Sequence, residues 1–166
     1  MSARIERMSP QFGQESVWDY PRPPKLERVT DRLHVMFGNE IIADTTNGFR
    51  LLETSHPPVY YFAPSDVAMV HLCQETGQSY CEFKGVARYW TLDVNGKASQ
   101  TAAWSYPEPS GDYVGLKNHL AFYASRVDAC FVGEERVAAQ NSDFYGGWIT
   151  SRVVGPFKGP PGTRFW

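Results

Sequence analysis

A proline-rich stretch in the middle of the chain limits what this sequence can fold into: Glu53-Thr-Ser-His-Pro-Pro-Val-Tyr-Tyr-Phe-Ala-Pro-Ser-Asp66. Each proline removes a backbone hydrogen-bond donor and fixes φ, so neither a helix nor a central strand can use this stretch as it stands. The same residues include two carboxylates, a histidine and two tyrosines. We therefore expect a rigid, shaped surface with many polar groups, beside which a pocket could form.

The length, composition and charge of the chain limit the class of protein to which it can belong. A chain of 166 residues fits one domain with a core of its own. Aromatic residues make up 14%, which suits a β-rich core or an aromatic binding surface. The formal net charge of −2 gives no basic excess, so we expect no nucleic-acid partner.

The N-terminal residues and the cysteines bear on location. Residues 1–9 alternate charged and apolar types without the apolar run of a secretory signal, and no run reaches the length of a membrane span. The three cysteines form no Cys-x-x-Cys pair, which argues against a disulfide framework or a four-cysteine zinc site. We expect a cytoplasmic protein with no membrane partner, no metal site and no cofactor.

Short apolar runs between turn residues predict a mainly β domain over 17–166, after a flexible tail over 1–16. A proline-rich arm over 18–24 should pack its rings on the domain. Asn95-Gly96 is a strong hairpin turn, and Gly38 and Gly133 mark two more. The expected strands are 32–37, 41–43, 49–53, 59–62, 79–83, 86–92, 98–104, 127–132, 136–139 and 144–154.

Two short helices are expected within this β framework. Pro64-Ser65-Asp66 has the features of a helix start, and Val67, Val70 and Cys73 would share one face of a helix ending by Gly77. The second helix would cover 116–121.

A repeat of short sequence motifs suggests that the chain has two related halves, about 18–90 and 104–166. Trp18-Asp-Tyr-Pro recurs as Trp104-Ser-Tyr-Pro, and Phe83-Lys84-Gly85 recurs as Phe157-Lys158-Gly159 in the same order. The alternative is convergent use of small turn motifs. In either case the second half has no equivalent of the 53–66 stretch, and additions to a scaffold more often carry function.

Several of these motifs together resemble a known family: Pro58-Val-Tyr-Tyr-Phe-Ala-Pro64, Cys81-Glu-Phe-Lys84-Gly85, Ala103-Trp104-Ser-Tyr106 and Phe122-Tyr123. Over about 33–132 the chain is similar to the uncharacterised family catalogued as "domain of unknown function 427". The resemblance implies a β-tent-like fold, similar to methionine sulfoxide reductase B and the ligand-binding domain of cereblon, and no established activity. The family is sometimes labelled nucleotidyltransferase-like, but this chain has no Asp-x-Asp pair to hold the metals of that reaction.

Polar candidates each have a structural alternative. Glu53 and Asp66 could act as acid and base, although Asp66 fits a helix cap and Glu53 could pair with Lys84 or Arg88. His56 should lie on an exposed loop. Cys81 could be a thiolate activated by Lys84, or a small buried residue. Lys84-Gly85 and Lys158-Gly159 could bind phosphate, but neither is a P-loop.

Aromatic candidates could form a cage for a flat or cationic ligand, or could belong to the core; they are Trp90, Trp104, Trp148, Tyr61, Tyr106 and Tyr145. The adjacent glycines Gly146 and Gly147 indicate close approach of a backbone or a ligand.

These observations predict a small-molecule-binding domain whose pocket is lined by Glu53, Tyr61, Asp66, Cys81, Lys84, Trp104, Tyr106, Tyr145 and Trp148. The alternatives are an enzyme, by thiol chemistry at Cys81 or by nucleotidyl transfer, and a structural interaction module. The sequence assigns no catalytic residue, leaves open whether the protein is an enzyme, and leaves a homodimer open.

Overall fold

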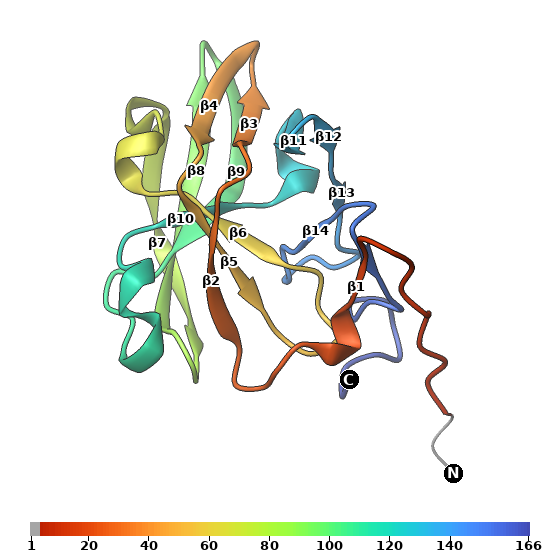
Figure 1. Ribbon diagram of the computed structural model, residues 1–166. Coiled ribbons are helices and arrows are strands. Elements are labelled where there is room, and N and C mark those ends of the chain that lie inside the picture. The colour runs from red at the N-terminus through yellow and green to blue at the C-terminus, as the bar shows by residue number, and fades with distance from the viewer. Residues whose placement is uncertain (1–3) are drawn as a thin grey trace.

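The computed structural model describes residues 4–166 and is mainly β, as the sequence predicted (Figure 1). Short strands are joined by tight turns, and the helical residues form 3-10 turns rather than α-helices. Within the described residues, no helix is long and apolar enough to cross a membrane.

One four-stranded antiparallel sheet has the order β10-β9-β8-β7. Its strands are β7 (Leu72–Cys81), β8 (Gly85–Val94), β9 (Lys97–Ser105) and β10 (Leu120–Phe122). A second sheet has the order β12-β11-β3-β4, with β3 (Leu33–Phe37), β4 (Glu40–Thr45), β11 (Ala129–Val132) and β12 (Glu135–Arg136). The main core takes side chains from both sheets, for example Phe37, Leu92 and Phe122.

A third sheet, β2-β5-β6, carries the proline-rich stretch into the fold. Its strands are β2 (Lys25–Val29), β5 (Gly48–Leu52) and β6 (Val59–Tyr61). β2 had no counterpart among the expected strands. Phe62 pairs with Leu120, which ties this sheet to β10, and a second core cluster forms where the two meet.

The hairpin turns follow the glycine and asparagine signals in the sequence. Gly38 and Asn39 join β3 to β4, and Asn95 and Gly96 join β8 to β9; all four residues have positive φ. This conformation suits the twist of a two-residue hairpin and favours Gly and Asn. Gly133 has the corresponding conformation in the turn between β11 and β12.

Both expected α-helices are wrong. The cap signals at 64–66 produce one 3-10 turn, η2 (Pro64–Asp66), and a second, η3 (Met69–His71), precedes β7. Val67 is extended and pairs with Ala43, so sheet pairing overrides the local helix signal. Val70 is 87% exposed while Val67 is buried, so the expected shared face does not exist.

The second expected helix also divides into a turn and a strand. η4 (Gly111–Leu116) ends where that helix was to begin, and Leu120 to Phe122 pair with β9 as β10. Another short turn, η5 (Ala124–Arg126), leads from β10 towards β11.

The two end segments of the described chain lie together (Figure 1). β1 (Glu15–Ser16) pairs in parallel with β15 (Val153–Val154), and η1 (Val17–Asp19) follows β1. The Trp18 indole donates to the Pro156 carbonyl at 2.9 Å, which packs the proline-rich arm on the C-terminal segment. Residues 15–16 thus join the fold, whereas residues 1–3 of the expected tail lie outside the described residues.

The last expected strand, 144–154, is much shorter than predicted. It contains β14 (Trp148–Ile149), which pairs with β13 (Ala138–Ala139), and the separate β15. The internal sequence repeat stays a prediction. β3 pairs with β11, so the two Gly-centred hairpins are neighbours. However, the matching tryptophans differ in structure, because Trp18 lies in a 3-10 turn and Trp104 lies in a strand.

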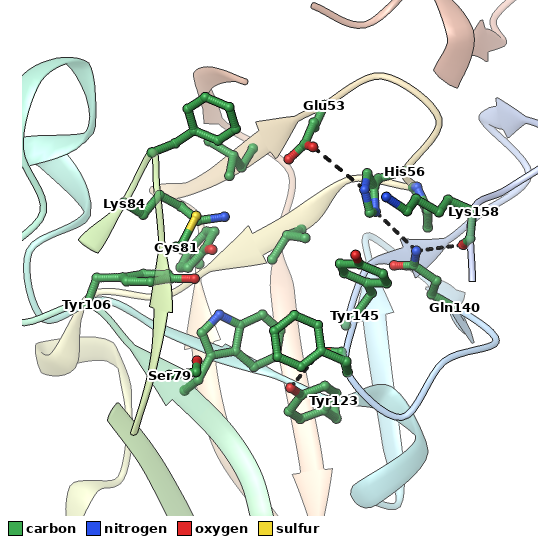
Figure 2. Close-up of a pocket in the computed structure, with 18 of the residues that line it drawn as sticks. Glu53, His56, Ser79, Cys81, Lys84, Tyr106, Tyr123, Gln140, Tyr145 and Lys158 are labelled. Atoms are coloured by element: carbon green, nitrogen blue, oxygen red, sulfur yellow. Dashed lines mark hydrogen bonds and ion pairs between the residues drawn. The ribbon is translucent and has the colours of Figure 1, made fainter. Parts of the chain in front are cut away.

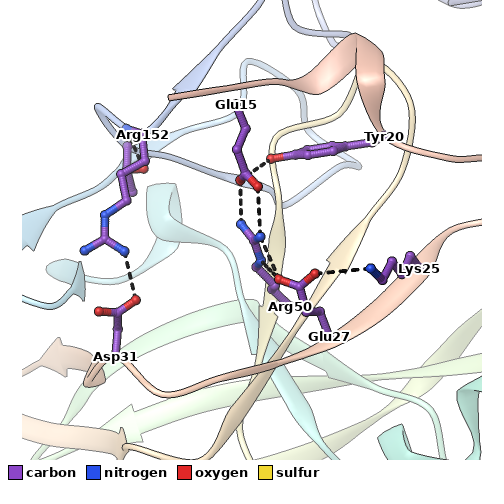
Figure 3. Close-up of polar contacts among 8 residues, drawn as sticks. Glu15, Tyr20, Lys25, Glu27, Asp31, Arg50 and Arg152 are labelled. Atoms are coloured by element: carbon purple, nitrogen blue, oxygen red, sulfur yellow. Dashed lines mark hydrogen bonds and ion pairs between the residues drawn. The ribbon is translucent and has the colours of Figure 1, made fainter. Parts of the chain in front are cut away.

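One arginine links β1, β2 and β5 (Figure 3). The Arg50 guanidinium on β5 donates to both carboxylate oxygens of Glu15, at 2.8 and 3.1 Å, and its Nε donates to Glu27 at 2.9 Å. Tyr20 donates to the same Glu15 carboxylate at 3.0 Å. The hydrogen bond from Arg50 lowers the pKa of Glu15, so the carboxylate is charged in the folded state.

We expect Arg50→Met to destabilise the fold by about 2 kcal/mol, because it removes three charged hydrogen bonds and leaves two carboxylates facing each other. Urea unfolding at neutral pH measures this change. Arg32→Met is the control, since the Arg32–Asp44 pair is exposed and its loss should destabilise the fold much less. The Arg50 effect should shrink in acid, because the stability from Glu15 is lost as pH falls through its lowered pKa. Equal effects of the two variants would contradict the prediction.

Candidate functional site

A cavity of about 200 Å³ opens between three parts of the chain (Figure 2). The first is the proline-rich stretch with β6, the second is the β7–β8 hairpin with the end of β9, and the third is the segment 140–158. Residues far apart in sequence therefore line one cavity.

Seven of the nine residues expected at the pocket line this cavity: Glu53, Tyr61, Cys81, Lys84, Trp104, Tyr106 and Tyr145. The other two do not. Asp66 accepts a hydrogen bond of 2.8 Å from Thr45, next to its 3-10 turn on another surface. Trp148 is 1% exposed within the core, where its indole donates to the Phe122 carbonyl at 2.9 Å.

The wall is mainly aromatic. Tyr61 and Trp104 meet edge to face with centroids 6.5 Å apart, and Trp104 lies 4.5 Å from Tyr123. Gly146 gives these rings room, because a Cβ there would lie 2.3 Å from the Trp104 ring. Eight lining residues are aromatic: Tyr61, Phe83, Tyr89, Trp104, Tyr106, Tyr123, Phe144 and Tyr145. Such a surface favours a flat ligand.

His56 is buried, at 7% exposed, and the expectation of an exposed loop is wrong. Gln140 holds it: the Gly147 N–H donates to the Gln140 carbonyl oxygen at 3.0 Å, so the amide nitrogen faces His56 Nδ1 at 3.2 Å. Nδ1 must then accept, which places the ring proton on Nε2. Burial, with the charges of Lys158, Arg22 and Lys84, lowers the pKa of His56 to about 3, so the ring is neutral.

Glu53 faces His56 from the proline-rich stretch. Its carboxylate lies 3.7 Å from His56 Nε2 and 3.3 Å from the Arg22 guanidinium. The contact with His56 is one between a carboxylate and a neutral N–H, not an ion pair. The expected partners of Glu53, Lys84 and Arg88, are replaced by Arg22 from the proline-rich arm.

Lys84 is placed by the β7–β8 hairpin. Cys81 pairs with Gly85, so residues 82–84 form the loop, and Gly85 has a φ of 91°. A three-residue loop of this kind favours glycine at its positive-φ position. The Lys84 ammonium lies 5.3 Å from the centroid of the Tyr106 ring.

Two side chains in the cavity wall carry a polar or reactive group: the Tyr61 hydroxyl and the Cys81 thiol. The Tyr61 hydroxyl is fully buried and donates no hydrogen bond within residues 4–166, while the Trp104 indole beside it is placed to donate to its oxygen. Burial raises the pKa of Tyr61, so the hydroxyl keeps its proton and can donate. Cys81 lines the cavity half-buried, while Cys73 is exposed and Cys130 is buried. Across residues 4–166, no three His, Cys, Asp or Glu side chains gather in a group that could hold a metal ion.

Sequence reasoning missed several lining residues, chiefly His56, Gln140 and Lys158. The Phe-Lys-Gly repeat did single out Lys158, but only as a weak phosphate signal. Gln140 carried no local signal, because its contacts are with residues distant in sequence.

Comparison with known families identifies the family of the chain. A family model described as "Domain of unknown function (DUF427)", labelled NTP_transf_9, matches residues 25–133. The chain belongs to this family. The match begins at the first residue of β2 and so extends further than the expected core of 33–132. No curated protein matches the chain.

We expect the buried neutral His56 to make stability fall in acid. An unfolded histidine titrates near about 6.5, so between that pH and about 3 the unfolded state binds a proton that the folded state does not. This residue should cost about 2 kcal/mol of stability on going from pH 7 to pH 5. His56→Asn keeps an acceptor for Gln140 but cannot titrate, so urea unfolding should show a smaller loss between the two pH values. His119→Asn, outside the pocket, is the control and should lose as much as the parent protein. An unchanged loss in His56→Asn would contradict the assignment.

Proposed function

We propose that this protein binds a small planar molecule in the cavity between the proline-rich stretch, the β7–β8 hairpin and the segment 140–158. The observation that carries the proposal is a cavity wall with eight aromatic residues. Ligand sites are typically apolar and aromatic, with a few polar groups that fix orientation.

The size of the cavity supports a ligand of about one ring. A dry protein cavity on the order of 150 Å³ is enough to bind benzene. This cavity, at about 200 Å³, has room for a ring with a small substituent. The substituent would contact the polar groups of the cavity, which are Glu53, Gln140, the His56 ring and the two lysines. We retain the cytoplasm as the expected location of the protein.

A fragment screen tests the proposal. Planar fragments of neutral, anionic and cationic types are added to the full chain, and the indole N–H signals are followed by NMR. We expect at least some fragments to shift the Trp104 indole signal, which is assigned with Trp104→Phe. If no fragment moves that signal, the proposal is wrong.

A matched pair of variants on β7 locates the binding. Cys81→Phe adds bulk at the cavity wall and should weaken fragment binding at least tenfold. Cys73→Phe adds the same bulk on the exposed part of the same strand and should leave binding unchanged. Equal binding by both variants would place the ligand elsewhere.

A second candidate, thiol chemistry, is favoured by the position of Cys81 in the cavity. Exposure alone predicts that Cys73 reacts faster with iodoacetamide, because Cys81 is half-buried. An activated Cys81 would reverse this order, since the thiolate is the reactive form. Peptide mapping by mass spectrometry compares the two rates, and faster alkylation of Cys73 would contradict the thiol mechanism. Nucleotidyl transfer and a structural interaction module stay predictions of the sequence.

A further inference from the structure

The two Phe-Lys-Gly segments converge on the same cavity. Lys84 comes from the β7–β8 hairpin and Lys158 from the C-terminal segment, and both line the pocket from opposite sides (Figure 2). The two lysines are 74 positions apart in the sequence (158 minus 84). The fold therefore brings two positive charges to a site whose walls are otherwise mostly aromatic.

Each pocket lysine lies over a tyrosine ring instead of pairing with an acid. The ammonium groups of Lys84 and Lys158 lie 5.3 Å from the centroids of Tyr106 and Tyr145, respectively. Within residues 4–166, neither ammonium has a carboxylate within 4.0 Å. Lys97 shows the contrast, since it lies over Phe37 at 4.7 Å but also pairs with Asp128 at 2.7 Å.

The carboxylates that line the cavity do not neutralise these lysines. Glu53 lies 3.3 Å from Arg22, so a third cation already pairs with it. Glu82 is exposed at the tip of the hairpin loop. The positive charges of the lysines act across the cavity on His56. Burial is the largest cause that lowers the pKa of His56, and the charges of Lys158, Arg22 and Lys84 lower it further.

A partly buried cation without a counterion is costly, and an anionic ligand would relieve that cost. The complement of two such cations is a negatively charged acceptor group.

We propose that the ligand of this pocket is a planar anion, an aromatic ring carrying a carboxylate or a similar small anionic group. The ring lies against the Tyr61–Trp104 wall, and the anionic group faces the ammonium groups of Lys84 and Lys158. This inference rests on the proposed function, because it names the class of molecule that the same cavity takes.

Three isosteric probes test the charge preference: benzoate, benzamide and benzamidine, which are anionic, neutral and cationic. Each is titrated into the full chain and followed at the Trp104 indole signal. We expect benzoate to bind at least tenfold more tightly than benzamide, as one charge-assisted hydrogen bond would give, and benzamidine to bind most weakly. Added salt should weaken benzoate binding and leave benzamide binding unchanged.

Variants assign the preference to the two lysines. Lys84→Gln and Lys158→Gln should each reduce the affinity for benzoate several-fold, and the double variant should bring it to that of benzamide. The affinity for benzamide should fall much less than that for benzoate in all three. Lys97→Gln is the matched control, because it removes a lysine that also lies over an aromatic ring but outside the cavity.

The outcomes separate this inference from the function on which it rests. If benzamide binds as tightly as benzoate, or if the lysine variants keep full affinity for benzoate, the anion inference is wrong while the pocket stands. The same holds if the fragment screen finds ligands and the anionic ones bind no better than the neutral ones. If no fragment of any charge binds, the proposed function fails and this inference fails with it.

Discussion

The candidate site depends on the side-chain amide of Gln140, which is 3% exposed. Its carbonyl oxygen accepts from the Gly147 N–H, and its nitrogen donates to the Lys158 carbonyl at 2.7 Å and to His56 Nδ1 at 3.2 Å. This amide thus reinforces the backbone hydrogen bonds that Lys158 and Trp148 donate to the Ser55 and Pro58 carbonyls, each at 2.8 Å. Because each of these contacts is buried or partly buried, loss of the amide would leave several polar groups unsatisfied at once. The tautomer of His56 follows from this amide, and Lys158 is held both by it and by the hydrogen bond from its own backbone N–H to the Ser55 carbonyl at 2.8 Å.

Two parts of the chain form the walls of the cavity. The sheets of the matched domain, residues 25–133, supply the wall with Tyr61, Cys81 and Trp104. The opposite wall comes from residues 140–158, beyond that match. The two walls fit closely, because a Cβ on Gly147 would lie 2.6 Å from the Pro57 carbonyl oxygen. The glycine at that position is therefore a requirement of the close approach, in agreement with what the paired glycines indicated in the sequence.

The sequence predicted the features that are encoded locally. Asn95-Gly96 formed its hairpin because both residues tolerate positive φ, which is a property of the residues themselves. The helix at 64–77 failed because no side chain caps the turn at Pro64–Asp66, whose N-cap is Ala63, and because Val67 pairs with Ala43. The burial of His56 could not be read locally, since its partner Gln140 is 84 positions away. Aromatic residues were identified as candidates, but composition does not distinguish a ring in the core, such as Trp148, from one in a cavity.

The span of these contacts has a consequence for how the protein folds. Non-local contacts form slowly, because the entropy of closing a long loop is lost before the contact is gained. The hairpins close over a few residues, whereas the Gln140–His56 contact closes a loop of 84 positions. The hairpins can therefore form before the cavity has its second wall, and the cavity is complete only after the long-range contacts, the β3–β11 pairing among them, have closed. A ligand of this cavity would act on the finished protein and shift its unfolding equilibrium by mass action, without guiding the early steps of folding.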